Sequence, residues 1–422
     1  MKKPNGGCTA ISDLLKIRAA ALLHDIGKPL SWANQEKWSE HINSTYKIVS
    51  EIFGEDTAII AKRHHSGRSY DQEDRPSSDL EWLVCVADTI SSGADRPKDK
   101  DVSGGGPAPS LPIKRSHLLS DGSVAIDSIE AKELGYFILS FKDAFTSAQL
   151  NNSTLAKMLQ FLSTSLANRI PADTRTPYND TSLFHHLKLT AAIANCLFRD
   201  NSFGCDPTSH SLSLISGDAD QIGNYVNESM RIPDLRGRSS IVIKGTEAAA
   251  EIFRKRLGPE CLLFSGGGSF LALSPTSMAE QLAKESKAAF EQVTESRCTI
   301  TTSHVNANGK DLQERFGEVW CEAINLMRKR KNSARSPVKF DEEYNICDVC
   351  QRERATHEGR PLPTIPPRNE MICTHCFKIR EETPGAWIDY ICDAKGYVGI
   401  LRLDGNNVGS LITGKHLKEF QE

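Results

Sequence analysis

The 422-residue sequence predicts a multidomain protein of the α+β class, and three observations indicate this class. Apolar residues recur at helical spacing through most of the first 200 residues. From about residue 205, strand-like segments alternate with amphipathic helices. A polar, proline-rich segment then carries two Cys-x-x-Cys pairs. We therefore expect four parts, namely an all-helical domain over 1–200, an α+β domain over 205–340, a cysteine module over 341–385 and the start of a further α/β unit over 386–422.

In the first domain, the spacing of apolar residues predicts helices over residues 11–28, 41–53, 57–65, 79–91, 129–169 and 182–198. Gly27 is expected to let the first of these helices end. Residues 96–116 are rich in glycine, proline, serine and charge. This composition indicates a long surface loop inside the domain, not a domain boundary.

The second domain contains strand-like segments at 211–219, 239–245, 261–275 and 297–305, with amphipathic helices at 277–295 and 311–330. The run from Ser265 to Ser269 predicts a tight hairpin whose glycines bring backbone N–H donors close to a base or a phosphate. A turn without a ligand explains the same residues. We expect Asp218, at a strand end, to hold a turn and not a metal.

Composition excludes several classes of function. A net charge of −3 rules out binding of nucleic acid by bulk attraction. One local basic run is either a solvated helix end or a nucleic-acid contact: Arg328, Lys329, Arg330, Lys331, Arg335 and Lys339. No apolar run reaches the ~18 residues of a membrane span, and the N-terminus lacks the apolar core of a secretory signal. We expect a cytoplasmic protein with reduced thiols and no membrane partner.

A set of histidines and aspartates indicates a metal site in the first domain. His24 and Asp25 stand side by side at the end of an apolar helix, and further members follow within about 65 residues: His41, His64, His65 and Asp88. Asp88 lies in an apolar helix, where an unpaired carboxylate is costly. A metal offsets this cost. A degenerate site that keeps the fold without the activity is the alternative.

The ligand types suggest the chemistry. Mixed histidine and aspartate ligands suit a divalent transition metal such as manganese, iron, nickel or cobalt. Two such ions close together favour hydrolysis of phosphodiesters or phosphomonoesters. Lys28 and Arg63 are candidates for contacting a phosphate, but we favour an ordinary surface position for each of them.

The cysteine module predicts a structural zinc site. Cys347 and Cys350 form one Cys-x-x-Cys pair, and Cys373 and Cys376 form the second after 22 intervening residues. Two such pairs give four thiolates in tetrahedral geometry and leave no open position for catalysis. A redox role needs only one pair. His357 and His375 are not expected to replace a cysteine ligand.

The order of these motifs resembles a known family. His24 is the first histidine of the chain, whereas HD-superfamily domains carry a further histidine before the His-Asp pair. Residues 181–198 supply that histidine on a later helix, as His186 or alternatively His185. The first domain therefore looks like a circularly permuted HD domain. Followed by a ferredoxin-like palm domain and a zinc-ribbon-like insertion, it resembles the large signature subunit of type III CRISPR effector complexes.

Five short segments carry this resemblance. Residues 214–226 resemble the first strand and turn of that family's first palm, 235–240 the start of its RGRS helix and 262–273 its glycine-rich hairpin. The four cysteines resemble its zinc finger, and residues 399–412 resemble the opening of its second palm. With so little chain after this opening, we expect the sequence to be an N-terminal portion of a longer protein.

The resemblance implies activities that composition does not show. The family's HD domain cuts single-stranded DNA when target RNA is bound, and its paired palms bind two ATP molecules with magnesium and join them into cyclic oligoadenylates. In this chain the nucleotide would be contacted by Ser265, Gly266, Gly267, Gly268, Asp404 and Asn407. The family's GGDD hairpin is not among these 422 residues. The family's Asp-x-Asp-Asn motif is here changed at Asn406, which puts cyclase activity in doubt.

The resemblance also implies partners, namely CRISPR RNA, target RNA, the other subunits of the complex and the single-stranded DNA substrate. Two alternatives remain open at this point. One is a stand-alone HD phosphohydrolase that acts on nucleotides. The other is a catalytically inactive scaffold, which the asparagine at position 406 favours.

Overall fold

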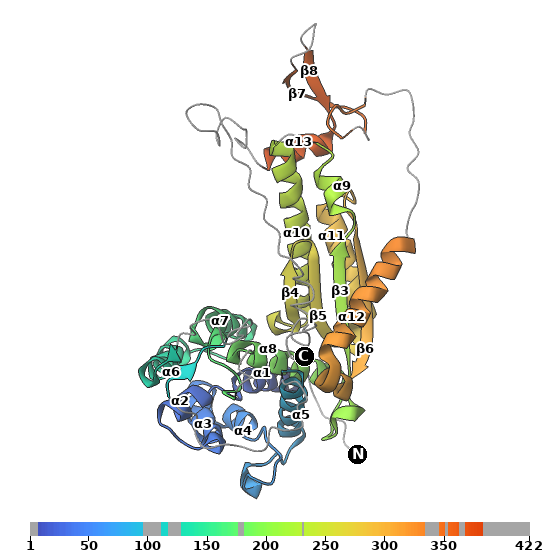
Figure 1. Ribbon diagram of the computed structural model, residues 1–422. Coiled ribbons are helices and arrows are strands. Elements are labelled where there is room, and N and C mark those ends of the chain that lie inside the picture. The colour runs from blue at the N-terminus through green and yellow to red at the C-terminus, as the bar shows by residue number, and fades with distance from the viewer. Residues whose placement is uncertain are drawn as a thin grey trace, which may run out of the picture.

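The structure is a computed structural model and describes residues 7–95, 111–116, 128–175, 181–229, 232–333, 346–350, 353–362 and 368–382. Figure 1 shows three parts: a helical domain, a sheet domain that stands against it, and a small cysteine module at the far end of the sheet domain. Residues 386–422, with Asp404, Asn406 and Asn407, lie outside the described residues.

The helical domain contains eight α-helices among the described residues, at positions close to those that the apolar spacing predicts. They are α1 (Gly7–Leu23), α2 (Lys28–Ala33), α3 (His41–Phe53), α4 (Glu55–Lys62), α5 (Asp79–Ala94), α6 (Ala131–Phe145), α7 (Asn152–Thr164) and α8 (Leu183–Arg199). Short 3-10 turns η1 (Trp38–Glu40), η2 (Gln72–Asp74) and η3 (Leu166–Asn168) and the strand pair β1 (Ile113–Lys114) and β2 (Ser128–Ile129) connect them.

The turn at Gly27 differs from the expectation. Gly27 has right-handed helical angles, φ −75° and ψ −19°, so it is not the left-handed residue that ends many helices. A Cβ atom at this position would lie 2.3 Å from the carbonyl oxygen of His41 and from the amide nitrogen of Thr45. Glycine is therefore required because α3 passes directly over this turn.

The sheet domain runs in the order β–α–β–β–α–β, which is the split βαβ order of a ferredoxin-like domain. Its strands, β3 (Ser211–Ala219), β4 (Leu262–Gly266), β5 (Ser269–Pro275) and β6 (Ile300–Asn308), form an antiparallel sheet in the order β4-β5-β3-β6. Its helices are α9 (Ile222–Val226), α10 (Ile232–Arg256), α11 (Ala279–Val293) and α12 (Gly309–Ser333), with turns η4 (Pro207–Ser209), η5 (Pro259–Cys261) and η6 (Thr276–Met278). Helix α12 is broken at Arg315, where φ is −146° and ψ is 41°.

The prediction of a strand at residues 239–245 is wrong, because this segment lies inside α10. Three β-branched residues in sequence suggested a strand. Burial, however, recurs in pairs four residues apart, at 233/234, 237/238, 241/242, 245/246 and 249/250, and Ile243 is exposed. That spacing is the period of a helix that packs along one face.

The cysteine module has a hairpin of β7 (His357–Leu362) and β8 (Arg368–Ile372) followed by α13 (Thr374–Glu381). Helix α13 packs closely on α10, where a Cβ atom at Gly237 would lie 2.4 Å from the carbonyl oxygen of Ile379. Arg380 of α13 bonds the buried carboxylates of Asp234 and Glu370, with contacts of 2.7 Å to each. The RGRS segment, residues 235–240, thus lies at the docking surface of the module.

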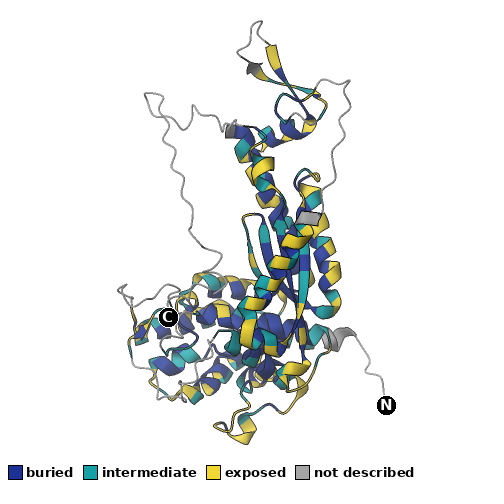
Figure 2. Cartoon of the chain, turned by 45° about the vertical axis from the view of Figure 1, so that its right-hand side comes forward, coloured by how far each residue is buried: buried dark blue, intermediate teal, exposed yellow. Residues whose placement is uncertain are grey.

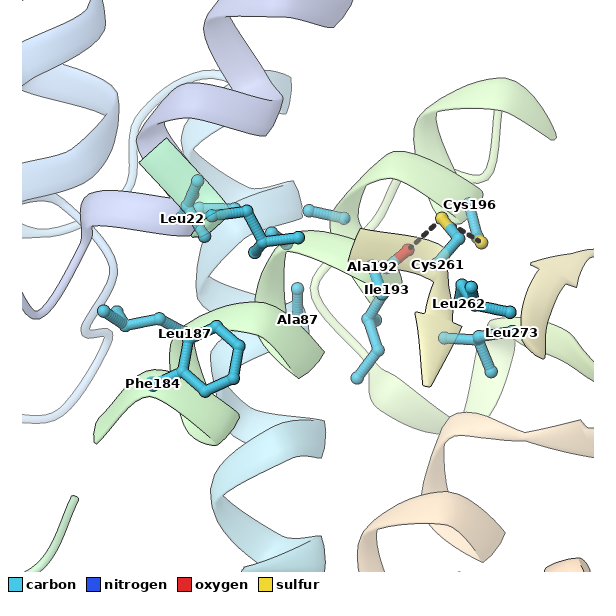
Figure 3. Packing of buried hydrophobic residues seen from close by; sticks show 14 of the residues in the cluster. Leu22, Ala87, Phe184, Leu187, Ala192, Ile193, Cys196, Cys261, Leu262 and Leu273 are labelled. Carbon is cyan, nitrogen blue, oxygen red and sulfur yellow. Dashed lines mark hydrogen bonds between the residues drawn. The ribbon is translucent and has the colours of Figure 1, made fainter. Parts of the chain in front are cut away.

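One hydrophobic core joins the helical and sheet domains (Figure 2). Figure 3 shows the junction, where α8 presents Ala192, Ile193 and Cys196 to Cys261, Leu262 and Leu273 of the sheet domain. A buried ion pair crosses the same junction, between Arg18 of α1 and Glu260 of η5. The cysteine module has a separate, small core that includes Cys347, Val349, Ile372, Cys373 and Cys376. The helical and sheet domains are therefore one packed unit, whereas the module has its own small core and docks on α10.

Within the described part of the chain, no helix is both long enough and apolar enough to cross a lipid bilayer.

Candidate metal centre

The residues of the predicted metal site converge in the middle of the helical domain. His24 and Asp25 follow the end of α1, His41 begins α3, His64 and His65 follow the end of α4, and Asp88 lies on α5. His186, on α8, joins them from almost 100 residues further along the chain. We call these seven residues the His–Asp cluster. All are buried except His65, which is partly exposed.

Asp25 lies at the centre of the His–Asp cluster and divides it in two. Its Oδ2 atom is 3.5 Å from Nε2 of His24 and 3.3 Å from Nε2 of His186. Its Oδ1 atom is 3.1 Å from Nε2 of His41 and 3.5 Å from Nε2 of His64. Oδ1 has no hydrogen-bond partner among the described residues, although it is buried. The carboxylate of Asp25 therefore faces two groups of imidazoles, with Oδ2 beside His24 and His186 and Oδ1 beside His41 and His64.

Asp88 and His65 complete the two groups. Oδ1 of Asp88 lies 3.4 Å from Nε2 of His24 and 3.2 Å from Nε2 of His186, and its Oδ2 lies 3.7 Å from Nδ1 of His65. Nε2 of His65 is 3.3 Å from Nε2 of His41. The ligand atoms fall into overlapping sets within 4.8 Å of one another: Asp25 with His41, His64 and His65; Asp25 with His24 and His186; and Asp88 with His24 and His64.

Four of the imidazoles are held in place by a hydrogen bond from Nδ1, the ring nitrogen that does not face the carboxylates. Nδ1 of His24 donates to the carbonyl oxygen of Ala21 at 2.8 Å, Nδ1 of His64 to that of Ala61 at 2.7 Å, and Nδ1 of His41 to that of Trp38. Nδ1 of His186 donates to a carboxylate oxygen of Asp95 at 2.7 Å. In each case the opposite nitrogen, Nε2, faces the carboxylates and can bind a metal once any proton on it is displaced, which is how proteins prepare histidines for metals.

Helix ends supply the carbonyls for His24 and His64. Ala21 and Ala61 lie in the last turns of α1 and α4, whose final carbonyls have no partner within the helix. Each histidine lies three residues further on, just beyond the end of the helix, and bonds back. Two helices therefore point their negative ends at the cluster, which adds to its preference for cations.

Electrostatics also favour a cation here. Burial alone would raise the pKa of the Asp25 carboxyl, but Lys28 and His24 hold that pKa well below its usual range. Burial opposes protonation of His186, but hydrogen bonds with Asp25, Asp88 and Asp95 outweigh it and raise its pKa well above the ordinary value. Burial and the neighbouring His64 lower the pKa of His65 well below the ordinary value. The cluster therefore holds ionised carboxylates beside imidazoles, the donor set that divalent transition metals prefer.

A pocket of about 580 Å³ opens onto the cluster. Asp25, His41, His65 and Asp88 lie in its wall, together with residues outside the cluster that include Lys28, Trp38, Tyr70 and Gln313. Lys28 is not an ordinary surface residue, because its Nζ lies 2.5 Å from Oδ2 of Asp25 and 3.2 Å from the carbonyl oxygen of Ala172. Arg63 instead contacts Ser77 and Glu81 and does not line the pocket.

Sequence reasoning missed several residues of this site. His185, the alternative to His186, is exposed and bonds Ser182, so only His186 faces the cluster. Asp95 was not recognised, although it lies seven residues after Asp88, which is two helical turns further on, directly after the end of α5. Gln313 comes from α12 of the sheet domain, and a Cβ atom at Gly93 would lie 2.1 Å from its Cγ. No local pattern in the sequence pointed to that approach.

The four cysteines of the module also converge, and we call them the cysteine cluster. The sulfur atoms of Cys347, Cys350, Cys373 and Cys376 lie within 4.8 Å of one another. His375 bonds Tyr225 and Glu295, and His357 stacks on Phe377. As expected, neither histidine is in the cluster. The buried guanidinium of Arg238, in the RGRS segment, lies 3.5 Å from Sγ of Cys376.

In the sheet domain, the glycine-rich segment forms the predicted hairpin between β4 and β5. Gly267 and Gly268 have φ values of 60° and 88°, which glycine adopts without strain. Asp218 is the second-last residue of strand β3 and does not lie in a turn, contrary to the expectation. Its side chain accepts a hydrogen bond from the hydroxyl of Ser269 at 2.5 Å. Lys331 bonds Asp218 and lies 3.5 Å from Asp220. Lys331 is therefore partly buried and paired with carboxylates, whereas Arg328, Lys329 and Arg330 of the same basic run are exposed.

These features define a helical domain with a buried histidine–aspartate cluster, joined to an antiparallel sheet domain. Residues 6–93 match the HD domain family. The chain is 24% identical over 368 residues to the CRISPR system single-strand-specific deoxyribonuclease Cas10/Csm1 (subtype III-A) of Enterococcus italicus, an alignment that covers 72% of this chain and 48% of that protein.

Solved structures agree with this likeness. The Csm1–Csm4 cassette in complex with cA3 matches with a TM-score of 0.59 and 17% identity, over 76% of this chain and 49% of that one. The cassette with one ATP matches with a TM-score of 0.57 and 18% identity, over 76% and 48% of the two chains. The resemblance to the large subunit of type III CRISPR complexes is thus confirmed, and the chain spans about half the length of these relatives.

Proposed function

We propose that the helical domain is a metal-dependent nuclease that hydrolyses phosphodiester bonds of single-stranded DNA, as part of the large subunit of a type III CRISPR effector complex. One observation carries the proposal. Four imidazoles, each fixed through Nδ1, direct Nε2 at the two carboxylates of Asp25 and Asp88 in the wall of an open pocket. The buried Oδ1 of Asp25, which has no hydrogen-bond partner among the described residues, supports the same proposal.

The residues present fit two divalent ions that share Asp25. His24, His186 and Asp88 would hold one ion with Oδ2 of Asp25, and His41, His64 and His65 would hold the other with Oδ1. Ions such as manganese, nickel, cobalt or iron supply Lewis acidity for phosphodiester hydrolysis when bound. The protein's own residues fix the ring orientations, and Lys28 keeps a positive charge beside Asp25 at the pocket wall.

We also propose that residues 205–340 are the first palm domain, that the helical domain is a circularly permuted HD domain with His186 in place of an earlier histidine, and that the cysteine cluster holds structural zinc. The hairpin at Ser265–Gly268 would contact ATP as half of a composite site in a longer parent. Because Lys331 bonds Asp218 and lies 3.5 Å from Asp220, a cation already occupies the space between these carboxylates. Magnesium would then bind through the second palm, where Asp404 and Asn407 lie.

The partners implied by the relatives are part of the same proposal. A Csm1–Csm4 subcomplex is among the matching structures, with a TM-score of 0.56. We therefore expect this chain to assemble with the other subunits of a type III complex, CRISPR RNA and target RNA, and to act in the cytoplasm.

The test compares substrates and metals. Purified chain with manganese should cut single-stranded DNA faster than it hydrolyses nucleotides, and Asp25→Ala should abolish cutting, with a loss of about 10³-fold or more because both ions lose a shared ligand. Equal cutting after Asp25→Ala would show that the assigned site is wrong. Faster hydrolysis of nucleotides would favour the stand-alone phosphohydrolase. A chain that retains zinc and no second metal, and cuts nothing, would be a scaffold.

A further inference from the structure

Two aromatic residues beside the His–Asp cluster have no role in holding a metal. Trp38 lies on η1, three residues before His41, and Tyr70 lies between α4 and α5. Their rings meet edge to face with centroids 5.6 Å apart, and Tyr70 also stacks on His65 at 4.7 Å. Both line the pocket that leads to Asp25 and Asp88. They form an aromatic wall next to the reacting centre.

Trp38 differs from an ordinary core tryptophan. Its exposed fraction is 38%, whereas Trp32, on the neighbouring helix, is 5% exposed. Indole rings are large apolar surfaces that proteins usually cover, so an exposed one at the mouth of a pocket suggests a surface kept for a ligand. The backbone of Trp38 bonds the ring of His41, and the indole lies against Tyr70 and His65, with ring centroids 5.6 and 6.4 Å apart.

Tyr70 supplies an independent observation. Its side chain is 6% exposed, and its hydroxyl group is buried without a hydrogen-bond partner among the described residues. A buried hydroxyl that lacks a partner is costly, and a neutral phenol is a hydrogen-bond donor. A ligand oxygen in the pocket would satisfy it. The phosphate oxygens of a phosphodiester at the His–Asp cluster are acceptors of this kind.

We propose that Trp38 and Tyr70 form a subsite for one unpaired nucleotide, in which a nucleobase stacks on the indole of Trp38 and the hydroxyl of Tyr70 donates to an oxygen of the adjacent phosphodiester. This inference rests on the proposed nuclease function and names how it selects its substrate. Bases inside a duplex are already stacked on both faces, so only a single-stranded or extruded base can lie against the indole. The wall therefore makes the pocket selective for unpaired strands.

The test separates the base from the backbone. Two ligands are compared: a single-stranded oligothymidylate and an abasic oligomer of equal length, whose sugar–phosphate chain carries no bases. Binding to the full chain is measured by fluorescence anisotropy with calcium, and cleavage is measured with manganese. Trp38→Ala should weaken binding of oligothymidylate by about 5- to 150-fold, the range that base–aromatic stacking gives, and should leave the abasic oligomer unchanged. Trp38→Phe should retain part of the preference.

Tyr70→Phe keeps the ring that stacks on His65. It should weaken the binding of both oligomers by the same factor, about tenfold or more, because the lost hydrogen bond is to the phosphate chain that both share. Tyr136→Ala is the control, because Tyr136 is an aromatic residue that is 67% exposed and does not line the pocket. This change should alter the binding of neither oligomer. Thermal melting and manganese content of every variant should match the unaltered chain.

The outcomes distinguish the two levels of inference. Equal weakening of both oligomers by Trp38→Ala, or equal binding of both by the unaltered chain, would overturn the stacking subsite. A base preference that Trp38→Ala removes, without any cutting by the unaltered chain, would support the subsite while refuting the proposed nuclease function.

Discussion

The His–Asp cluster draws its side chains from residues 24 to 186, whereas the cysteine cluster draws its four from residues 347 to 376. The first lies within a core shared by two domains, and its rings are fixed by helix ends and by Asp95. The second lies in a small core that consists largely of its own cysteines. The protein thus positions the first cluster by folding, whereas we expect the second to need a bound ion to fold.

The largest expected effect follows from removing zinc. A bound structural zinc contributes on the order of 10 kcal/mol to the folding of such a module, so chelation or Cys373→Ser should unfold β7, β8 and α13. Limited proteolysis together with zinc content measures this. If chelation also removes metal from the His–Asp cluster, the helical circular dichroism signal of the first domain should not change. Loss of both domains together would contradict the comparison.

The docking of the cysteine module is tested at Gly237. Alanine there places a Cβ atom 2.4 Å from the carbonyl oxygen of Ile379, so Gly237→Ala should destabilise the contact between α10 and α13 by about 1–3 kcal/mol. Gly135→Ala, on α6, is the matched control, because a Cβ atom there meets nothing within 4 Å, and it should be neutral or stabilising. Hydrogen exchange at α13 distinguishes the two. Unchanged protection at α13 in Gly237→Ala would mean that the module does not rely on this surface.

The positioning of the His–Asp cluster is tested at Asp95. Replacing it with asparagine removes the charged acceptor behind His186, and manganese affinity should fall by about 10- to 100-fold while the fold persists. Calorimetric titration measures the affinity. Asp79→Asn, on the same helix but exposed, should bind manganese normally. If both variants bind alike, His186 does not need its carboxylate.

The pH dependence of metal binding is expected to be the smallest effect. Because Asp25, Asp88 and Asp95 raise the pKa of His186 against the effect of burial, a proton competes with the metal up to a pH above the ordinary histidine range. Manganese affinity should therefore be full at high pH and fall by about tenfold per unit as pH drops through that raised pKa, for each proton displaced. Titrations in buffers of different ionisation enthalpy count these protons. An affinity that is flat down to pH 6 would contradict this assignment.

The sequence predicted those features that local pattern encodes. The helix containing Asp88, the hairpin at Gly267 and Gly268, and the two Cys-x-x-Cys pairs each carry their signal within a few residues. The segment 239–245 was mistaken for a strand because its β-branched residues outweighed the four-residue spacing of its buried positions. The approach of Gln313 to Gly93 and the unpartnered hydroxyl of Tyr70 depend on contacts between distant segments, and a single sequence contains no record of these.

Helix α12 has one further consequence. Its first turns carry Gln313 into the wall of the pocket beside the His–Asp cluster, and 18 residues later Lys331 bonds Asp218 and the carbonyl oxygen of Ala219 at the end of β3. The same element thus contacts both places, and its break at Arg315 lies between them, close to the pocket. A displacement at the end of β3 is therefore expected to reach the pocket beside the His–Asp cluster through α12.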